Sequence, residues 1–219
     1  MKFPNAKKGI SKMFTAEILY IISAILLGIA AIAIAVAITG SSQDVISNAA
    51  AGGTAVGGGL LVVLGSIIAL VGGIISLVGI VQAAKDEEMF KNALYLMICY
   101  FVISLVVSLA LSATGFKGYV SSGSTIIELF GAIFVAKGII NLADKLQNAE
   151  VAAKGLVYIK LLIAVFVLDI IIKFFVAFTE NKAAQAIALT LAIATLIISV
   201  AKYVIYISLL AKAKKMLDE

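Results

Sequence analysis

The chain has 219 residues, of which 63% are hydrophobic and 13% are charged, and its mean hydropathy is +1.18. Soluble proteins carry about a quarter of their residues as charged side chains, so this composition excludes a soluble protein and predicts a polytopic membrane protein. The net charge of +5 comes from lysine alone, a balance expected from orientation signals and anionic lipid, and it does not indicate nucleic acid as a partner.

Six apolar runs follow one another along the chain, each long enough for a membrane span of about 20 residues. They predict an all-α, polytopic membrane protein with six transmembrane helices in three helical hairpins. The hairpins are expected at about 15–84, 92–143 and 156–211 of a single domain over residues 1–219. The runs cover residues 15–39, 57–84, 92–113, 124–143, 156–178 and 184–211.

Lysines precede the first run, as in a signal peptide, but the run over 18–38 is longer than the 7–15 apolar residues of a cleavable signal. We therefore expect a membrane anchor there. Residues 40–54, which are polar and rich in glycine, are predicted to form a loop between the first two spans.

Lysines are distributed unevenly between the two expected sides of the membrane. The three loops on one side carry only Lys117 and Lys182. An excess of lysine marks the cytoplasmic side, so both termini are predicted to be cytoplasmic and the location to be the plasma membrane. The opposite side carries eleven lysines, namely Lys2, Lys7, Lys8, Lys12, Lys85, Lys91, Lys145, Lys154, Lys212, Lys214 and Lys215.

Small residues recur along one stripe of the second run and along one stripe of the first. Such stripes let two helices approach closely in lipid, so we expect the first two helices to pack antiparallel along them. An alternative use is an interface in a homo-oligomer or pore. The stripe of the second run is Gly58, Gly65, Ala69, Gly72, Ser76, Gly79 and Ala83, and that of the first is Ala24, Gly28, Ala31 and Ala35.

Charged residues inside the apolar runs are the first candidates for function, because each is costly in lipid unless it is paired or hydrated. Asp169 and Lys173 are four residues apart on one helix face, and Glu128 is expected at the depth of Lys173. If the fourth and fifth helices are neighbours, these residues form a cluster of two acids and one base. One interpretation is that they hold the bundle together. The other is ion-coupled transport, because two carboxylates near one ammonium do not both ionise easily.

Signatures of enzymes are missing from the sequence. The chain has no histidine, and its glycine clusters are not followed by the Gly-Lys-Ser/Thr of a phosphate-binding loop. We therefore expect no catalytic residues, no metal site and no cofactor.

Size, six spans and the spacing of Ala31 and Ala35 are similar to those of the substrate-binding S-components of bacterial vitamin transporters, which implies a small transporter. Aromatic and polar residues for a vitamin pocket are sparse here, so no family is assigned. The leading hypothesis is an accessory or interaction subunit, embedded in the lipid bilayer, that contacts a membrane or cytoplasmic protein partner. The alternatives are a small transporter or channel using Asp169, Lys173 and Glu128, and a pore-forming oligomer built on the glycine stripe.

Overall fold

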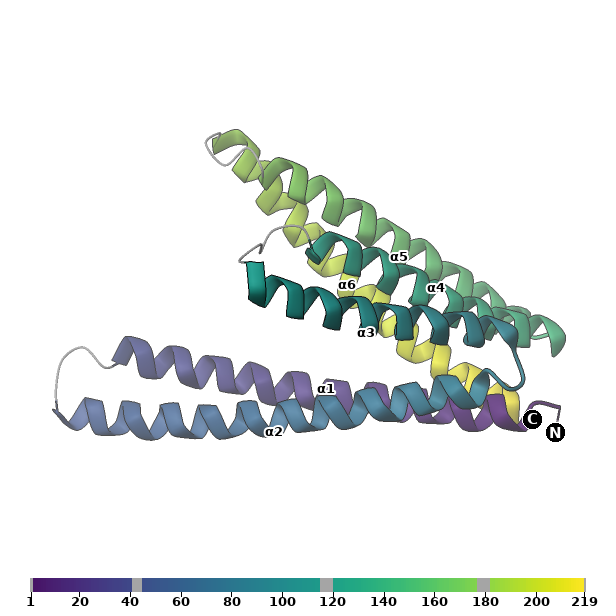
Figure 1. The fold of residues 1–219 in the computed structure, drawn as a ribbon, viewed down its shortest axis with the longest axis horizontal. Helices are drawn as coiled ribbons and strands as arrows, with labels where there is room; N and C mark the ends of the chain where they lie inside the picture. The colour runs from purple at the N-terminus through teal and green to yellow at the C-terminus, as the bar shows by residue number, and fades with distance from the viewer. Residues whose placement is uncertain (1, 41–44, 115–119, 177–181, 219) are drawn as a thin grey trace. The chain divides into compact units, whose positions relative to one another are not determined.

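The computed structural model describes residues 2–40, 45–114, 120–176 and 182–218. The described chain is helical throughout apart from short turns, and its helices form the hairpins α1·α2, α3·α4 and α5·α6 (Figure 1), which confirms the all-α prediction. The helices are α1 (Pro4–Gly40), α2 (Val45–Ala83), α3 (Glu88–Thr114), α4 (Val120–Lys145), α5 (Ala149–Val176) and α6 (Lys182–Asp218).

Within the described residues, five helices are long and apolar enough to cross a membrane. In four of these spans few residues are buried, and their outer faces carry large aliphatic side chains such as Ile32, Leu70 and Leu196. Surfaces of this kind require lipid rather than water, so the chain is a multi-pass integral membrane protein. The five spans are Pro4–Ala37, Val56–Ala83, Ile126–Lys145, Ala149–Val176 and Gln185–Asp218.

The predicted span at 92–113 falls on α3, where the side chains of several residues lie outside the described set, so this span stays a prediction.

The ends of three helices, α1, α2 and α6, differ from the predicted runs. The loop predicted at 40–54 is wrong over 45–54, because α2 begins at Val45. Three alanines at 49–51 favour helix there and outweigh the local glycines. Helices α1 and α6 also run past the predicted apolar runs, to Pro4 and Asp218.

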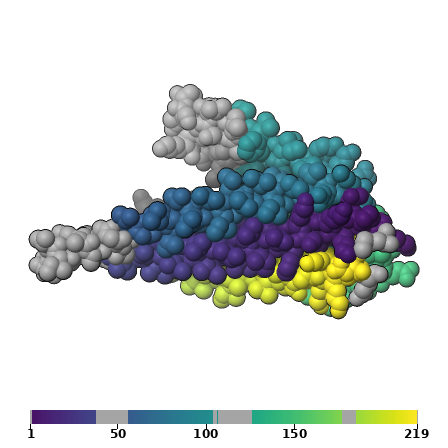
Figure 2. Space-filling view, turned by 90° about the horizontal axis from the view of Figure 1, so that it is seen from below, coloured from purple at the N-terminus to yellow at the C-terminus, as the bar shows by residue number. Residues whose placement is uncertain are grey.

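The chain divides into two compact units, residues 12–79 and residues 1–11 with 80–219, which are described in turn. The first unit is the α1·α2 hairpin, whose helices lie against each other along their length (Figure 2). Each step of seven residues along α2 is matched by a step of seven back along α1. Seven-residue repeats are typical of the packing of knobs into holes in coiled coils. The glycine holes of α2 and the knobs of α1 that meet them are Gly58 with Ile34, Gly65 with Leu27, and Gly72 with Tyr20.

Close approach is what requires glycine on α2. A Cβ atom added at Gly58 would lie 2.8 Å from Cγ1 of Ile34, and one added at Gly65 would lie 2.9 Å from Cγ of Leu27. The same approach lets the hydroxyl of Ser23 donate a buried hydrogen bond of 2.8 Å to the carbonyl oxygen of Gly65. Dispersion contacts and this hydrogen bond therefore hold the hairpin together in lipid.

The face of α1 predicted to meet α2 is wrong. Ala24, Gly28, Ala31 and Ala35 are exposed, and a Cβ atom added at Gly28 would meet nothing within 4 Å. Two flat stripes in contact would leave gaps without dispersion partners, whereas a glycine hole is filled by a larger knob. The stripe of small residues on α1 that is buried instead is Ala16, Ser23, Ala30 and Ala37.

In the second unit, α4 packs on both α3 and α5, α5 packs on α6, and α6 also approaches α4. Its most buried side chains lie near the chain termini and include Ile10, Phe90, Leu142 and Leu209. Gly138 makes room for Phe90, because a Cβ atom there would lie 2.7 Å from the ring. This core fixes one end of the α3–α6 bundle and so positions the side chains between α4, α5 and α6.

Candidate functional site

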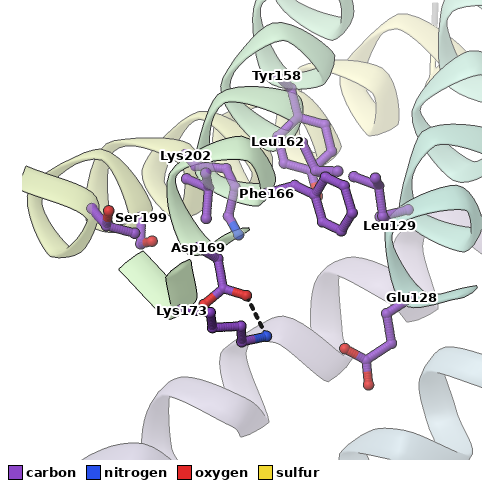
Figure 3. Close-up of a pocket in the computed structure, with 12 residues that line it drawn as sticks. Glu128, Leu129, Tyr158, Leu162, Phe166, Asp169, Lys173, Ser199 and Lys202 are labelled. Atoms are coloured by element: carbon purple, nitrogen blue, oxygen red, sulfur yellow. Dashed lines mark ion pairs between the residues drawn. The ribbon is translucent and has the colours of Figure 1, made fainter. Parts of the chain in front are cut away.

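A pocket of about 600 Å³ lies between α4, α5 and α6, and we call it the α4–α6 pocket (Figure 3). Its lining combines aliphatic and aromatic side chains with four charged groups, two hydroxyls from α6 and the ring of Tyr158. The lining residues are Glu128, Leu129 and Ala132 from α4, Tyr158, Leu162, Val165, Phe166, Asp169 and Lys173 from α5, and Thr195, Ser199 and Lys202 from α6.

Asp169 and Lys173 form an ion pair in this pocket. Lys173 Nζ lies 2.7 Å from Asp169 Oδ2, at the spacing of one helix turn. The two side chains keep 51% and 39% of their surface exposed, Lys173 and Asp169 respectively, so the pair is open to the pocket rather than sealed in the bundle. An open pair of this kind can exchange partners with a bound solute.

Glu128 lines the same pocket from α4, on a helix that packs directly against α5. The structure thus brings the three predicted charged residues to one cavity. Within the described residues, however, Glu128 forms no ion pair with Lys173. In Figure 3 the Glu128 carboxylate stands apart from the Asp169–Lys173 pair.

Lys202 is the charged residue of the pocket that sequence reasoning missed. The apolar run predicted at 184–211 places Lys202 nine positions before its end, where a long lysine side chain can reach the membrane interface. In the structure α6 continues to Asp218, so Lys202 is about 24 Å from the helix end, and it lines the pocket beside Ser199. The cluster of two acids and one base is therefore a balanced set of two acids and two lysines.

Tyr158 closes one end of the pocket. Its ring stacks on Tyr206 of α6 with the centroids 4.9 Å apart, and only 6% of Tyr158 is exposed. Tyr158 and Lys173, at the two ends of the pocket lining on α5, are fifteen positions apart, which corresponds to about 22 Å along the helix axis. The hydrocarbon core of a bilayer is about 30 Å thick, so this length covers much of a membrane crossing.

A second polar group lies at the end of the bundle near the chain termini. Glu87, in the turn between α2 and α3, is 5% exposed and accepts hydrogen bonds from Asn141 Nδ2 at 2.9 Å and from Lys145 Nζ at 2.5 Å. Burial is the largest influence and opposes its ionisation, but the bonds from Lys145 and Asn141 and the charge of Lys145 together hold the pKa of Glu87 below its ordinary value. The pair ties α4 to the α2–α3 turn.

Asp86, next to Glu87, caps the start of α1. Its Oδ2 accepts from the backbone N–H groups of Asn5 and Ala6, each at 2.8 Å, and its Oδ1 accepts from Asn5 Nδ2 at 2.9 Å. The first N–H groups of a helix lack partners within the helix, and Pro4 at the first position needs none. The ion pair of Lys7 with Asp218, at 2.6 Å, places the two ends of the chain together.

The remaining charged contacts of this end join α5 to α6. Lys154 Nζ donates to Ser208 Oγ at 2.7 Å, and Lys212 pairs with Glu150. Asn148 caps α5 by accepting from the N–H of Val151 at 3.1 Å. These contacts set the position of α5 against α6 and hence the walls of the α4–α6 pocket.

Comparison of the chain with protein-family models, with curated proteins and with solved structures finds no match.

Proposed function

We propose that the protein is a small membrane transporter that takes a polar solute into the α4–α6 pocket and performs no enzymatic chemistry. One observation supports this most directly, namely the cavity of about 600 Å³ at the level of the charged residues. Ligand pockets commonly have volumes of about 300–1,000 Å³.

The charges of the pocket also favour a solute pathway. Ionisable residues within spans are costly, and they commonly mark the route of a substrate or ion. Here they are distributed over three helices, with Glu128 on α4, Asp169 and Lys173 on α5, and Lys202 on α6. A purely structural role requires only the Asp169–Lys173 pair, and leaves Glu128 and Lys202 unexplained.

Solute access is tested by thiol labelling in a Cys99→Ser background, because Cys99 is the only cysteine of the chain. Ala132→Cys places a thiol in the pocket lining, and Ala136→Cys places one a helix turn away at a fully buried position. A charged, membrane-impermeant methanethiosulfonate reagent is expected to label the first at least tenfold faster than the second in proteoliposomes. Equal rates would show that the pocket is closed to water and would remove the proposal.

Transport itself is tested by solute uptake and membrane-potential signals in the same liposomes. Asp169→Asn and Lys173→Gln are expected to abolish both signals. Lys160→Gln is the matched control, because Lys160 is also on α5 but does not line the pocket. Loss of uptake in the Lys160 variant alone, or uptake unchanged by all three, would place transport elsewhere.

An accessory subunit is the second candidate function, and the end of the bundle near the chain termini favours it. Helices α1 and α6 run past the apolar segments and are joined there by the Lys7–Asp218 pair, and the Asp86 cap joins the start of α1 to the α2–α3 turn. The joined helix ends offer a partner protein a defined surface. We expect a partner protein bound at this end to be recovered by crosslinking from Lys85 or Lys91. Crosslinks confined to α2 would contradict this candidate.

The pore-forming oligomer gains no support, because Gly58, Gly65 and Gly72 face α1 within the hairpin. An oligomer built on this stripe would first have to displace α1.

A further inference from the structure

The walls of the α4–α6 pocket differ in charge. The α5 and α6 side carries Lys173, Lys202 and Asp169, two positive groups and one negative, for a net charge of +1. The α4 side carries Glu128 alone, for a net charge of −1. Asp169 is paired with Lys173 at 2.7 Å, and the pocket offers a solute two further charged groups, Lys202 on one wall and Glu128 on the other.

Hydrogen-bonding groups strengthen this division. The hydroxyl of Thr195 donates within its own helix, to the carbonyl oxygen of Leu191 at 2.8 Å. Ser199 also lines the pocket, one helix turn from Lys202. The hydroxyl of Ser199 and the ammonium of Lys202 are both donors, the pair of groups that a carboxylate binds well. The carboxylate of Glu128 only accepts when it is ionised, which suits an ammonium.

Apolar side chains occupy the space between the two walls. Figure 3 shows the Phe166 ring pointing across the pocket toward Leu129 of α4, with Glu128 farther along the same helix. Leu162, Val165 and Ala132 extend this apolar surface. A solute that reaches from one wall to the other therefore needs an apolar body between its charged ends.

We propose that the α4–α6 pocket binds an amphoteric solute of short-peptide size, with its carboxylate at Lys202 and Ser199, its ammonium at Glu128 and its apolar body against Phe166 and Leu129. This inference rests on the proposed function, because it requires the pocket to admit a solute. Two extended residues reach about 7 Å, and a dipeptide is the smallest peptide that carries an ammonium, a carboxylate and apolar side chains, so it is a suitable probe.

The test is binding of leucyl-leucine to the full chain in lipid nanodiscs, beside the N-acetylated and C-amidated forms of the same dipeptide. Each blocked form lacks one charge, and loss of a charge-assisted hydrogen bond weakens binding by about tenfold or more. We expect the unmodified dipeptide to bind at least tenfold more tightly than either blocked form.

Two variants assign the ends of the solute. Glu128→Gln is expected to bind leucyl-leucine and its N-acetylated form equally, because the partner of the ammonium is gone. Lys202→Met is expected to bind leucyl-leucine and its amide equally. Lys160→Met, which removes a charge from α5 outside the pocket, is expected to keep the full preference. Equal thermal midpoints for the three variants show that folding is not the cause.

Labelling of Ala132→Cys separates failure of this inference from failure of transport. Three outcomes would overturn the amphoteric solute but leave an open pocket. They are equal binding of the three dipeptides, tighter binding of a blocked form, and no binding of any dipeptide although the Ala132→Cys variant is labelled. Absence of both labelling and binding would overturn the proposed function together with the inference.

Discussion

Glu87 is buried, and its partners Lys145 and Asn141 keep its carboxylate ionised there. Because its pKa is lower in the folded chain than in the unfolded chain, it stabilises the fold fully above its ordinary pKa. That contribution is lost as the pH falls through the lowered value. Glu87→Gln is therefore expected to lower the stability by about 1–3 kcal/mol at pH 7.

The measurement is the thermal unfolding midpoint in detergent at pH 7 and at pH 3. The gap between wild type and Glu87→Gln is expected to narrow at pH 3, because below the ordinary glutamate pKa the unfolded chain binds a proton that the folded carboxylate resists. Asp144→Asn, at an exposed position near Lys145, is the control and is expected to change the stability by no more than about 0.5 kcal/mol. A gap that widens in acid would contradict the assigned role of the pair.

Asp86 has a separate role, because it acts on the backbone of α1 rather than on a charged side chain. Loss of a helix cap costs about 0.5–2 kcal/mol, so Asp86→Ala is expected to speed hydrogen exchange in the peptide covering residues 2–12. Asp86→Asn keeps one accepting oxygen and is expected to restore most of the protection. Exchange that is equally fast in both variants would mean that charge, rather than capping, holds the start of α1.

At the scale of elements, the hairpin α1·α2 offers a matched pair of glycines. Gly65 faces Leu27, whereas Gly28 faces open space. Leucine has the same advantage over glycine in helix propensity at both positions, so the comparison isolates packing. Gly65→Leu is expected to lower the stability by about 1–3 kcal/mol or more through overpacking.

Gly28→Leu is expected to leave the thermal midpoint close to that of the wild type, because the added side chain meets lipid. The two variants are compared by thermal unfolding and by the yield of folded protein in detergent. A larger loss for Gly28→Leu than for Gly65→Leu would mean that the predicted face of α1, rather than the observed one, meets a neighbouring helix.

The same hairpin shows which part of the fold the sequence predicts. Gly58, Gly65 and Gly72 mark one face of α2, because glycine in an aliphatic helix leaves a groove on that side only. The first helix is rich in alanine on several faces, so its own small residues do not distinguish one face from another. The facing surface is set by the larger knobs Leu27 and Ile34, and their match to glycine appears only when both helices are considered together.

For the pocket, the sequence predicts how deep a charged residue lies along its helix better than it predicts which residues form ion pairs. A rise of about 1.5 Å per residue places Glu128 and Lys173 at a similar level, and both line the α4–α6 pocket. The contribution of Lys202 depends on where α6 ends, and hydropathy ends the helix too early because its last turns contain three lysines and an aspartate. The Asp86 and Glu87 contacts join segments more than 50 residues apart, which spacing in the sequence does not reveal.

At the scale of the whole molecule, the orientation in the membrane is the remaining prediction. The ion pair of Lys7 with Asp218 places both ends of the chain together, as an even number of spans requires. Lysine is costly to translocate, and lysines close to span ends on one side set the orientation. Since the predicted topology assigns eleven lysines to the side of the termini and two to the other, both termini are expected in the cytoplasm.

Reporter fusions test this orientation in a bacterial host. Green fluorescent protein fused to either end is expected to fluoresce, and alkaline phosphatase inserted within residues 41–44 is expected to be active, because those residues join the far ends of α1 and α2. Substituting Lys2, Lys7, Lys8 and Lys12 by glutamine removes four of the eleven lysines and is expected to produce a mixed orientation. Active phosphatase at either terminus of the unmodified chain would contradict the prediction and would place the Glu87–Lys145 end of the bundle outside the cell.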